Sequence, residues 1–393
     1  MTGSRLYLDH NATTPLRPEA RAAMLAALDV TGSASSVHAE GRAARRIVEE
    51  AREKVASLVG AAAKAVVFVS GATEANATAL TPHWRRGPAD RPLEHCLVSA
   101  VEHASVLAGG RFAPDRVEML PVDGAGRADL PAWSARMADL RQANERPLVS
   151  LMLANNETGV LQPVAALAEA VQAAGGVLHA DAAQAAGKIA ISMATLRADL
   201  LTLSGHKLGG PFGSGALVLA SEALHLAEPL IAGGGQERGA RAGTENLPAI
   251  AGFGAAAEAA ARDLAAEAVR QRALQGRLEA GLGRIAPDVV VFGQGAERLP
   301  NTICFAVPGI PAETTLMALD LQGVAVSSGS ACSSGKVRAS HVLKAMAVVP
   351  DLASGAIRVS LGRSTAAEDV ERFLAVFHRV HRTIYEKRRM RAA

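Results

Sequence analysis

Cysteine is scarce in this chain of 393 residues, which contains only Cys96, Cys304 and Cys332, far apart in the sequence. A disulfide framework needs more cysteines than these three, and a zinc site needs cysteine or histidine ligands clustered at short spacings, so the sequence predicts neither. Cys96 and Cys304 lie in apolar, strand-like runs, where we expect buried and unreactive thiols. So few cysteines favour a reducing compartment, and we expect a cytoplasmic protein.

Net charge and long hydrophobic runs are also scarce. The 41 Lys and Arg residues are interspersed with 38 Asp and Glu residues, which leaves a net charge of +3 and predicts no nucleic-acid-binding patch. No apolar run reaches the roughly 20 residues of a membrane-spanning helix, and the first residues lack the apolar core of a signal peptide. We therefore expect no nucleic-acid partner and no membrane association.

Aliphatic residues are abundant, because 49% of the chain is hydrophobic while only 3% is aromatic. A chain of this length exceeds the usual size of a single core, so two domains are expected. Short apolar runs alternate with helix-length segments, a pattern typical of an α/β fold with a mostly parallel, buried sheet. The predicted strands of this sheet are 65–69, 96–99, 149–153, 177–180, 200–203 and 216–219.

The rest of the chain predicts helices around this sheet and a second, smaller α/β part. The pattern indicates an amphipathic helix over 37–59, an alanine-rich helix over 249–282, and strands at 302–307, 324–326 and 357–360. Thr365 followed by Glu368 is a capping-box pattern that predicts the start of the last helix. We expect an N-terminal segment (1–15) packed with the small domain, a large domain (16–258) and a small C-terminal domain (259–393).

Polar residues follow four of the predicted strands. They are Ser70-Gly71-Ala72-Thr73-Glu74, Asn155-Asn156-Glu157, Asp181 with Gln184, and Ser204-Gly205-His206-Lys207. Ligands bind beyond the carboxyl ends of strands in open α/β sheets, so we expect these segments to form one site.

The types of residue in this set match the needs of a pyridoxal phosphate site. A glycine-containing turn that opens a helix, at Gly71, offers backbone N–H groups and a positive dipole end to a phosphate. Lys207 can form a Schiff base with the aldehyde, and Asp181 can keep the pyridine nitrogen protonated. Alone, Lys207 would be interpreted as a surface lysine and Asp181 as a capping carboxylate. The ordered set predicts pyridoxal 5'-phosphate as cofactor.

Cys332 lies in a segment rich in glycine and serine, Ser327–Gly335. Gly329 and Gly335 permit backbone conformations that other residues avoid, so the segment can carry an accessible thiol. A small apolar cysteine in an ordinary turn fits the local sequence equally well.

Together these motifs resemble the cysteine desulfurases of the NifS/IscS type, in the class V branch of the fold-type I pyridoxal phosphate enzymes. The resemblance runs nearly end to end. Beside the motifs above it includes 7–15, Glu102-His103, 233–238, 241–244 and 357–362. It implies a large domain with a mostly parallel sheet of the seven-stranded type and a smaller α/β domain that carries the Cys332 loop.

The resemblance also implies roles for single residues. Lys207 would hold the cofactor covalently, Asp181 would pair with the pyridine nitrogen, and His103 would stack on the ring and carry protons. Asn156 and Gln184 would contact the ring oxygen, and Arg358 and Asn11 would bind the substrate. The phosphate would be held by Ala72, Thr73, Ser204, His206 and, from the partner subunit of a homodimer, Thr244.

The implied activity is conversion of L-cysteine to L-alanine, with the sulfur held on Cys332 as a persulfide. An acceptor or scaffold protein in iron–sulfur cluster assembly or another sulfur transfer would then receive it. No resident metal is expected, although Cys332 could bind an iron–sulfur cluster transiently. The alternatives are a selenocysteine lyase, another class V aminotransferase, or a sulfur-carrier or scaffold protein that is not an enzyme.

Overall fold

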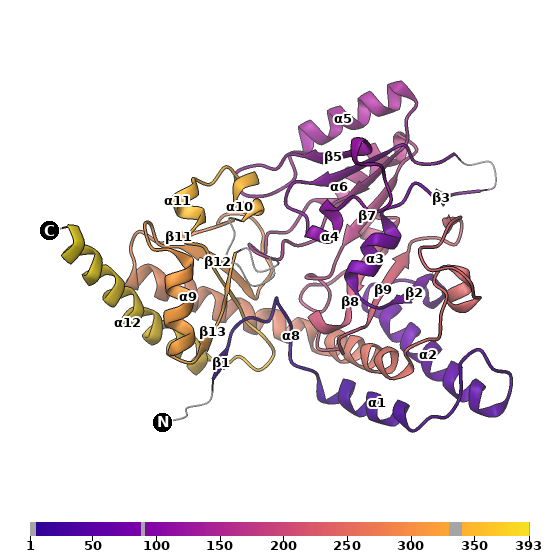
Figure 1. Ribbon diagram of the computed structural model, residues 1–393, viewed down its shortest axis with the longest axis horizontal. Helices are drawn as coiled ribbons and strands as arrows, with labels where there is room; N and C mark the ends of the chain where they lie inside the picture. Colours follow the sequence, from indigo (N-terminus) through magenta and orange to yellow (C-terminus); the bar gives the residue numbers. More distant parts are fainter. Residues whose placement is uncertain (1–4, 88–90, 330–339, 393) are drawn as a thin grey trace.

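The computed structural model describes residues 5–87, 91–329 and 340–392, and it consists of two bodies of unequal size (Figure 1). The larger body is built on a seven-stranded sheet and the smaller body on a four-stranded sheet. Helix α8 (Leu247–Ile285) runs through both. Its first half packs in the core of the large body, up to Ala260, and its second half packs in the small core from Leu274 onward. The domain limit at 258/259 stays a prediction.

The large sheet has the strand order β2-β9-β8-β7-β6-β4-β5. Its strands are β2 (Val66–Val69), β4 (His95–Ser99), β5 (Val117–Leu120), β6 (Pro147–Ser150), β7 (Val177–Asp181), β8 (Leu200–Ser204) and β9 (Gly215–Leu219). Neighbouring strands from β5 to β8 pair in parallel, whereas β9 runs antiparallel to both β8 and β2. The expected mostly parallel α/β sheet is therefore confirmed.

The structure adds two details to the predicted sheet. The strand predicted at 216–219 is antiparallel, because the segment between β8 and β9 is too short for the crossover that a parallel pair needs. Strand β5 was not predicted, because its sequence Val-Glu-Met-Leu lacks a continuous apolar run. It is an edge strand, and Glu118 on it is exposed enough to pair with Arg136 Nη2 at 2.6 Å.

Helices cover both faces of the large sheet (Figure 1). They are α1 (Pro18–Leu28), α2 (Ala39–Leu58), α3 (Ala72–Ala79), α4 (Ala104–Leu107), α5 (Leu130–Ala143), α6 (Val164–Ala173) and α7 (Met193–Leu196). The helix predicted at 37–59 corresponds to α2, whose first turn is capped by His38 and which ends before Gly60 at φ +62°. Helices α1 and α2 both pack on α8, and Gly254 brings α8 within direct contact of the α2 backbone.

The small sheet has the order β11-β12-β15-β14. Its strands are β11 (Val290–Val291), β12 (Thr302–Ala306), β14 (Ser327–Ser328) and β15 (Ile357–Ser360). Helices α9 (Ala312–Leu321), α10 (His341–Ala345), α11 (Pro350–Ala353) and α12 (Ala367–Ala392) surround it. Strand β1 (Leu6–Tyr7) pairs in parallel with β13 (Val324–Ala325), which ties the N-terminal segment to this body.

Short elements complete the described chain. They are β3 (Trp84–Arg85), β10 (His225–Leu226) and the 3-10 turns η1 (Ala63–Ala65), η2 (Pro114–Arg116), η3 (Gly205–Lys207) and η4 (Gln236–Gly239). The capping box predicted at Thr365 is wrong, because Thr365 Oγ1 accepts from Gly362 N instead. Asp369 closes the first turn of α12 by accepting from Ala366 N at 2.9 Å.

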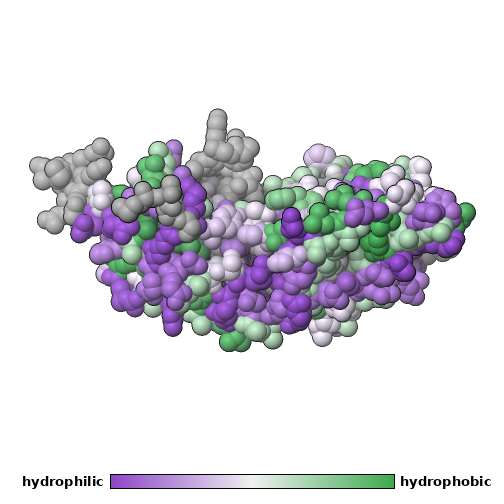
Figure 2. Space-filling view, turned by 90° about the horizontal axis from the view of Figure 1, so that it is seen from below, coloured by the Kyte–Doolittle hydropathy of each residue, from purple (hydrophilic) through white to green (hydrophobic). Residues whose placement is uncertain are grey.

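The surface is mixed in polarity. Seen from below Figure 1, hydrophobic residues gather over the end of the molecule away from α12 (Figure 2). Large exposed apolar side chains of the large body include Leu25, Leu28, Val37 and Phe212. Among the described residues, no helix combines the length and the hydrophobicity needed to cross a membrane.

Candidate active site

One cavity of about 430 Å³ collects nearly all the predicted site residues. The residues that line it from the predicted set are Asn11, Ala72, Thr73, His103, Asn156, Asp181, Gln184, Ser204, His206, Lys207 and Arg358. Most of them lie at or just after the ends of β2, β4, β6, β7 and β8, as the predicted strand ends require. Asn11 comes from the segment after β1, and Arg358 comes from β15 of the small body. The cavity therefore lies where the two bodies meet.

Two predicted residues are not part of this lining. Thr244 lines an adjoining pocket, which shares Ser70, Gly213 and Ser214 with the main cavity. Cys332 lies outside the described residues. The resemblance assigns Thr244 to the site of a partner subunit, and that assignment stays a prediction.

The start of α3 forms one wall of the cavity. The first turn of a helix has backbone N–H groups without partners inside the helix, and here they belong to the segment around Ala72 and Thr73. Strand β9 can pack closely against this turn because its first residue is Gly215. A Cβ atom at that position would lie only 2.7 Å from Gly71 Cα. This wall thus offers N–H donors and a positive dipole end to an anion.

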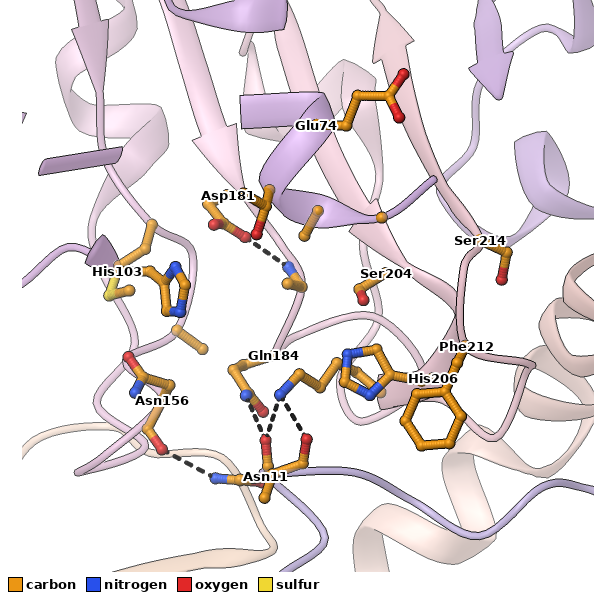
Figure 3. Close-up of a pocket in the computed structure, with 18 of the residues that line it drawn as sticks. Asn11, Glu74, His103, Asn156, Asp181, Gln184, Ser204, His206, Phe212 and Ser214 are labelled. Carbon is orange, nitrogen blue, oxygen red and sulfur yellow. Dashed lines mark hydrogen bonds between the residues drawn. The ribbon is translucent and has the colours of Figure 1, made fainter. Parts of the chain in front are cut away.

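Ser204 and His206 lie toward the same end of the cavity, whereas His103 and Asp181 lie toward the other (Figure 3). Burial lowers the pKa of His206 to about 4, and the charges of Lys207 and Lys188 act in the same direction. The ring is therefore neutral at pH 7. A neutral imidazole, hydroxyl groups and helix N–H groups suit a phosphate, and a carboxylate at the far end suits a protonated pyridine nitrogen. The residues present fit pyridoxal phosphate.

Lys207 lies in η3, directly after β8. Its Nζ donates to the backbone carbonyl oxygens of Asn11 at 2.7 Å and Ala12 at 2.9 Å (Figure 3). These carbonyl groups hold the amine at the cavity wall.

Asp181 is the last residue of β7, and its exposed fraction is 5%. Its Oδ1 accepts from Ala183 N at 2.9 Å, and its Oδ2 accepts from Asn76 Nδ2 at 2.8 Å. Each carboxylate oxygen is thus anchored by one N–H group and retains capacity to accept another.

His103 caps the N-terminus of α4, and its Nδ1 accepts from Ser105 N at 3.2 Å. Burial lowers the pKa of His103, and the positive charge of Lys207 and the presence of His341 add to this effect, while Asp181 opposes it. Glu102, the preceding residue, is fully buried, and burial together with the Asp181 charge raises its pKa well above the usual range.

Asn11 connects the two bodies at the floor of the cavity. Its backbone carbonyl accepts from Lys207 Nζ and from Gln184 Nε2, the latter at 2.9 Å. Its side chain donates to Thr302 Oγ1 at 2.8 Å and accepts from Asn301 Nδ2 at 3.0 Å. With 1% of its surface exposed and these protein partners, the Asn11 side chain has a clear architectural role. Its contact with substrate stays a prediction.

Lys188 is a buried lysine that sequence reasoning missed. Its Nζ donates to Gln184 Oε1 at 2.7 Å and to Asn11 Oδ1 at 3.2 Å. This contact fixes the orientation of the Gln184 amide, so that the Nε2 end donates. Burial, followed by the charges of Lys207 and Arg358, holds the pKa of Lys188 well below its usual range. No sequence pattern pointed to Lys188, because its partners meet it only in the folded chain.

Arg358 is 2% exposed and carries an ion pair that the sequence did not predict. Its Nη2 donates to Asp9 Oδ1 at 2.7 Å, and its Nη1 donates to the backbone carbonyl of Asn156 at 3.0 Å. Its Nε is buried and has no partner among the described residues. A guanidinium with a free donor suits a carboxylate ligand. Asp9 would share the guanidinium with such a ligand.

The described cysteines and the other residues of metal-binding type form no second reactive site or metal site in the part of the chain that the structure describes. Cys96 and Cys304 are buried free thiols, as expected, and burial, with Glu102 adding to it, raises the pKa of Cys96 to about 12. Across 5–87, 91–329 and 340–392, no group of three or more His, Cys, Asp or Glu residues is placed to hold a metal ion.

Comparison with known proteins agrees with this geometry. The model of the family described as "Aminotransferase class-V" matches residues 6–373. The chain belongs to the class-V aminotransferase family. The predicted family and fold are thereby confirmed.

Similar proteins indicate which members of the class-V family this chain resembles. It is 45% identical over 378 residues to a protein of Cereibacter sphaeroides called cysteine desulfurase, and the match covers 95% of this chain and 94% of that one. A solved NifS-like protein from Rickettsia africae is 32% identical with a TM-score of 0.85, covering 96% of this chain and 99% of the other. A structure named SspA in complex with cysteine is 28% identical with a TM-score of 0.73, covering 90% and 98%.

Proposed function

We propose that this class-V protein is a pyridoxal phosphate-dependent cysteine desulfurase that converts L-cysteine to L-alanine. The observation that carries the proposal is the convergence of Lys207, Asp181, the α3 N-terminus and Arg358 on one cavity. Relatives called cysteine desulfurase and the neighbour solved with cysteine support the choice of substrate. They do not favour a selenocysteine lyase, another class V aminotransferase or a sulfur carrier without enzyme activity.

In this proposal each end of the cavity holds one part of the cofactor. The α3 residues Ala72 and Thr73, with Ser204 and His206, would hold the phosphate, and Thr244 of a partner subunit would add a contact. Asp181 would pair with the pyridine nitrogen, His103 would stack on the ring, and Asn156 and Gln184 would contact the ring oxygen. When bound, pyridoxal phosphate withdraws electrons from the α-carbon of an amino acid.

The residues of the chain would then divide the work on the substrate. Arg358 binds the substrate carboxylate through its guanidinium, with Asn11 beside it. Lys207 Nζ, which would hold the cofactor in the resting enzyme, takes the proton from the α-carbon, and His103 carries a proton within the cavity.

Cys332 Sγ, as thiolate, attacks the substrate sulfur. The new S–S bond forms as the C–S bond breaks, and the bonding electrons stay with the carbon fragment. This fragment takes up one proton at its β-carbon and regains one at its α-carbon, which gives alanine. The thiol of Cys332 is thus oxidised to the persulfide level, and the carbon of the substrate is reduced.

The proposal extends to assembly and delivery. A homodimer would bring Thr244 to the partner's cavity, and the exposed apolar side chains of Leu25, Leu28, Val37 and Phe212 offer surface for such contact. Cytoplasmic location, transfer of the persulfide to an acceptor in iron–sulfur cluster assembly or another pathway, and transient cluster binding by Cys332 belong to the same proposal.

The test is to load the protein with pyridoxal phosphate, add L-cysteine, and measure alanine and cysteine-bound persulfide together. The expected result is alanine equal to the sulfur released plus the sulfur held on Cys332. Alkylation should mark Cys332 selectively, because Cys96 and Cys304 are buried. Absence of alanine with fully loaded protein would refute the proposal.

Two variants separate the steps. Lys207→Ala should lose both the visible absorbance of bound cofactor and all turnover, whereas Lys64→Ala, at an exposed lysine paired with Glu222, should keep both. Cys332→Ala should keep the absorbance and bind cysteine but release no sulfide. Full sulfide release by Cys332→Ala would overturn the assignment of the nucleophile.

A further inference from the structure

A continuous chain of hydrogen bonds joins the two cofactor residues Asp181 and His103. Asn76, on α3, donates from Nδ2 to Asp181 Oδ2 at 2.8 Å and to Ser105 Oγ at 2.9 Å. Ser105, on α4, lies with its Oγ 2.8 Å from His103 Nδ1. Residues from α3, α4, β7 and the turn before α4 are thereby tied together beside the cavity. We call Asn76 and Ser105 the α3–α4 brace.

The direction of each bond in the brace follows from its donors and acceptors. An ionised carboxylate only accepts, so the Asn76 amide must turn its NH2 group toward Asp181. The second N–H of the same group points to Ser105 Oγ, which therefore accepts there. The backbone N–H of Ser105 already points at His103 Nδ1, so this nitrogen is an acceptor. The single proton of the Ser105 hydroxyl group is free to donate, and it points to His103 Nδ1.

This arrangement selects one tautomer of His103. With Nδ1 accepting from the backbone and from the hydroxyl group, the ring proton of neutral His103 must be on Nε2. Protonation of Nδ1 would set its N–H against the backbone N–H of Ser105. The amide of Asn76 cannot pass a proton, so the brace fixes positions and does not conduct protons.

We propose that Asn76 and Ser105 are positioning residues that hold the Asp181 carboxylate and the His103 ring in one fixed relation, with the proton of neutral His103 on Nε2. That these two groups face pyridoxal phosphate rests on the proposed function. The brace itself is a property of the protein without cofactor. Asn76 is fully buried and its Oδ1 has no partner among the described residues, so the polar contacts of its side chain are the two donations of the brace.

The proposal makes a defined prediction for the titration of His103. The hydroxyl bond to Nδ1 stabilises the neutral ring, so Ser105→Ala should raise the pKa of His103 by about half a unit to one unit. The other groups that act on this ring are Asp181, Lys207 and His341, and they are unchanged by the substitution. Ser105→Thr retains a hydroxyl group and should restore the wild-type midpoint.

The measurement is 15N NMR of histidine-labelled protein without cofactor, in which the signals of His103 are identified by their loss in His103→Gln. Wild-type protein should show the proton on Nε2 and an unprotonated Nδ1 at pH 7. A wild-type ring with the proton on Nδ1, or an unchanged midpoint in Ser105→Ala, would overturn the proposal. These spectra need no cofactor, so they stand even if the protein fails to bind pyridoxal phosphate, a failure that would refute the proposed function alone.

Cofactor affinity gives a second readout. Asn76→Ala frees Asp181 Oδ2 and should weaken binding of pyridoxal phosphate about tenfold, as expected for loss of a bond to a charged group. Thr78→Val is the matched control, because Thr78 is also buried on α3 but its hydroxyl group has no partner among the described residues. Equal losses in Asn76→Ala and Thr78→Val would contradict the brace. If Asn76→Ala does not fold, the Ser105 spectra still decide.

Discussion

Glu157 provides a quantitative test of how burial sets charge next to the cavity. It follows Asn156, is 2% exposed, and accepts a hydrogen bond from Ser340 Oγ. Burial raises the pKa of its carboxyl group to about 7, although the bond from Ser340 and the charge of Arg358 lower it. Glu157 therefore takes up a proton on folding between about pH 4.5 and pH 7.

The free energy involved follows from this shift. The pKa rises from 4.5 to about 7, and one unit corresponds to 1.36 kcal/mol, so the cost to folding is about 3 kcal/mol when the group is ionised. The native state binds more protons than the unfolded chain in this interval. Stability therefore falls as the pH rises from about 4.5 to 7, and the loss is complete above pH 7.

Glu157→Gln removes this titration and retains an oxygen that accepts from Ser340. Relative to wild type, the variant should gain almost nothing at pH 4.5 and up to about 3 kcal/mol at pH 8. Chemical denaturation of cofactor-free protein at a series of pH values measures the difference. His10, His179 and His206, whose pKa values burial lowers to about 4, titrate in both proteins and cancel.

The matched control is Glu258→Gln, at a glutamate whose side chain is 60% exposed. It should change stability by less than about 1 kcal/mol at every pH, since exposed ion pairs contribute little. A stability difference between Glu157→Gln and wild type that is independent of pH, or that favours wild type above pH 7, would refute the reasoning.

Three further predictions concern close packing and buried charge. Gly254→Ala should destabilise the protein by about 1–3 kcal/mol in thermal unfolding, because the new Cβ would lie 2.6 Å from a backbone atom of α2. The control is Gly276→Ala on the same helix, where a new Cβ meets open space, and this variant should be neutral or stabilising. Glu237→Gln should cost about 3–5 kcal/mol in chemical denaturation, because it breaks a buried bidentate pair with Arg52 at 2.6 and 2.9 Å; a loss below 1 kcal/mol would contradict this. Arg358→Lys should raise the KM for cysteine at least tenfold in steady-state kinetics, since an ammonium cannot replace the bidentate fork, and an unchanged KM would exclude Arg358 from carboxylate binding.

Several parts of the fold were predictable from local pattern. Continuous apolar runs predicted the buried strands β2, β7 and β8, because strands covered on both faces need no polar alternation. The edge strand β5 and the direction of β9 were not predictable in this way. An edge strand has a weaker pattern, and strand direction depends on where the chain returns.

The candidate site divides in the same manner. The strand ends that carry Asp181 and Lys207 were predictable, because the carboxyl ends of parallel strands meet at one edge of a sheet. Asp9 and Ser105 were missed as partners of Arg358 and His103. Neither pair of side chains is predicted by a spacing along the sequence.

By itself, the sequence determined the α/β class, the order of the main strands and the set of reactive side chains at their ends. These properties depend on the periodic spacing of hydrophobic residues and on residues that are adjacent in the chain. Only the tertiary structure decided that Asp9 forms an ion pair with Arg358 and that Lys188 orients Gln184. It also decided that Asn76 and Ser105 join Asp181 to His103. These contacts arise because folding places distant polar groups together out of water, where each must find a partner.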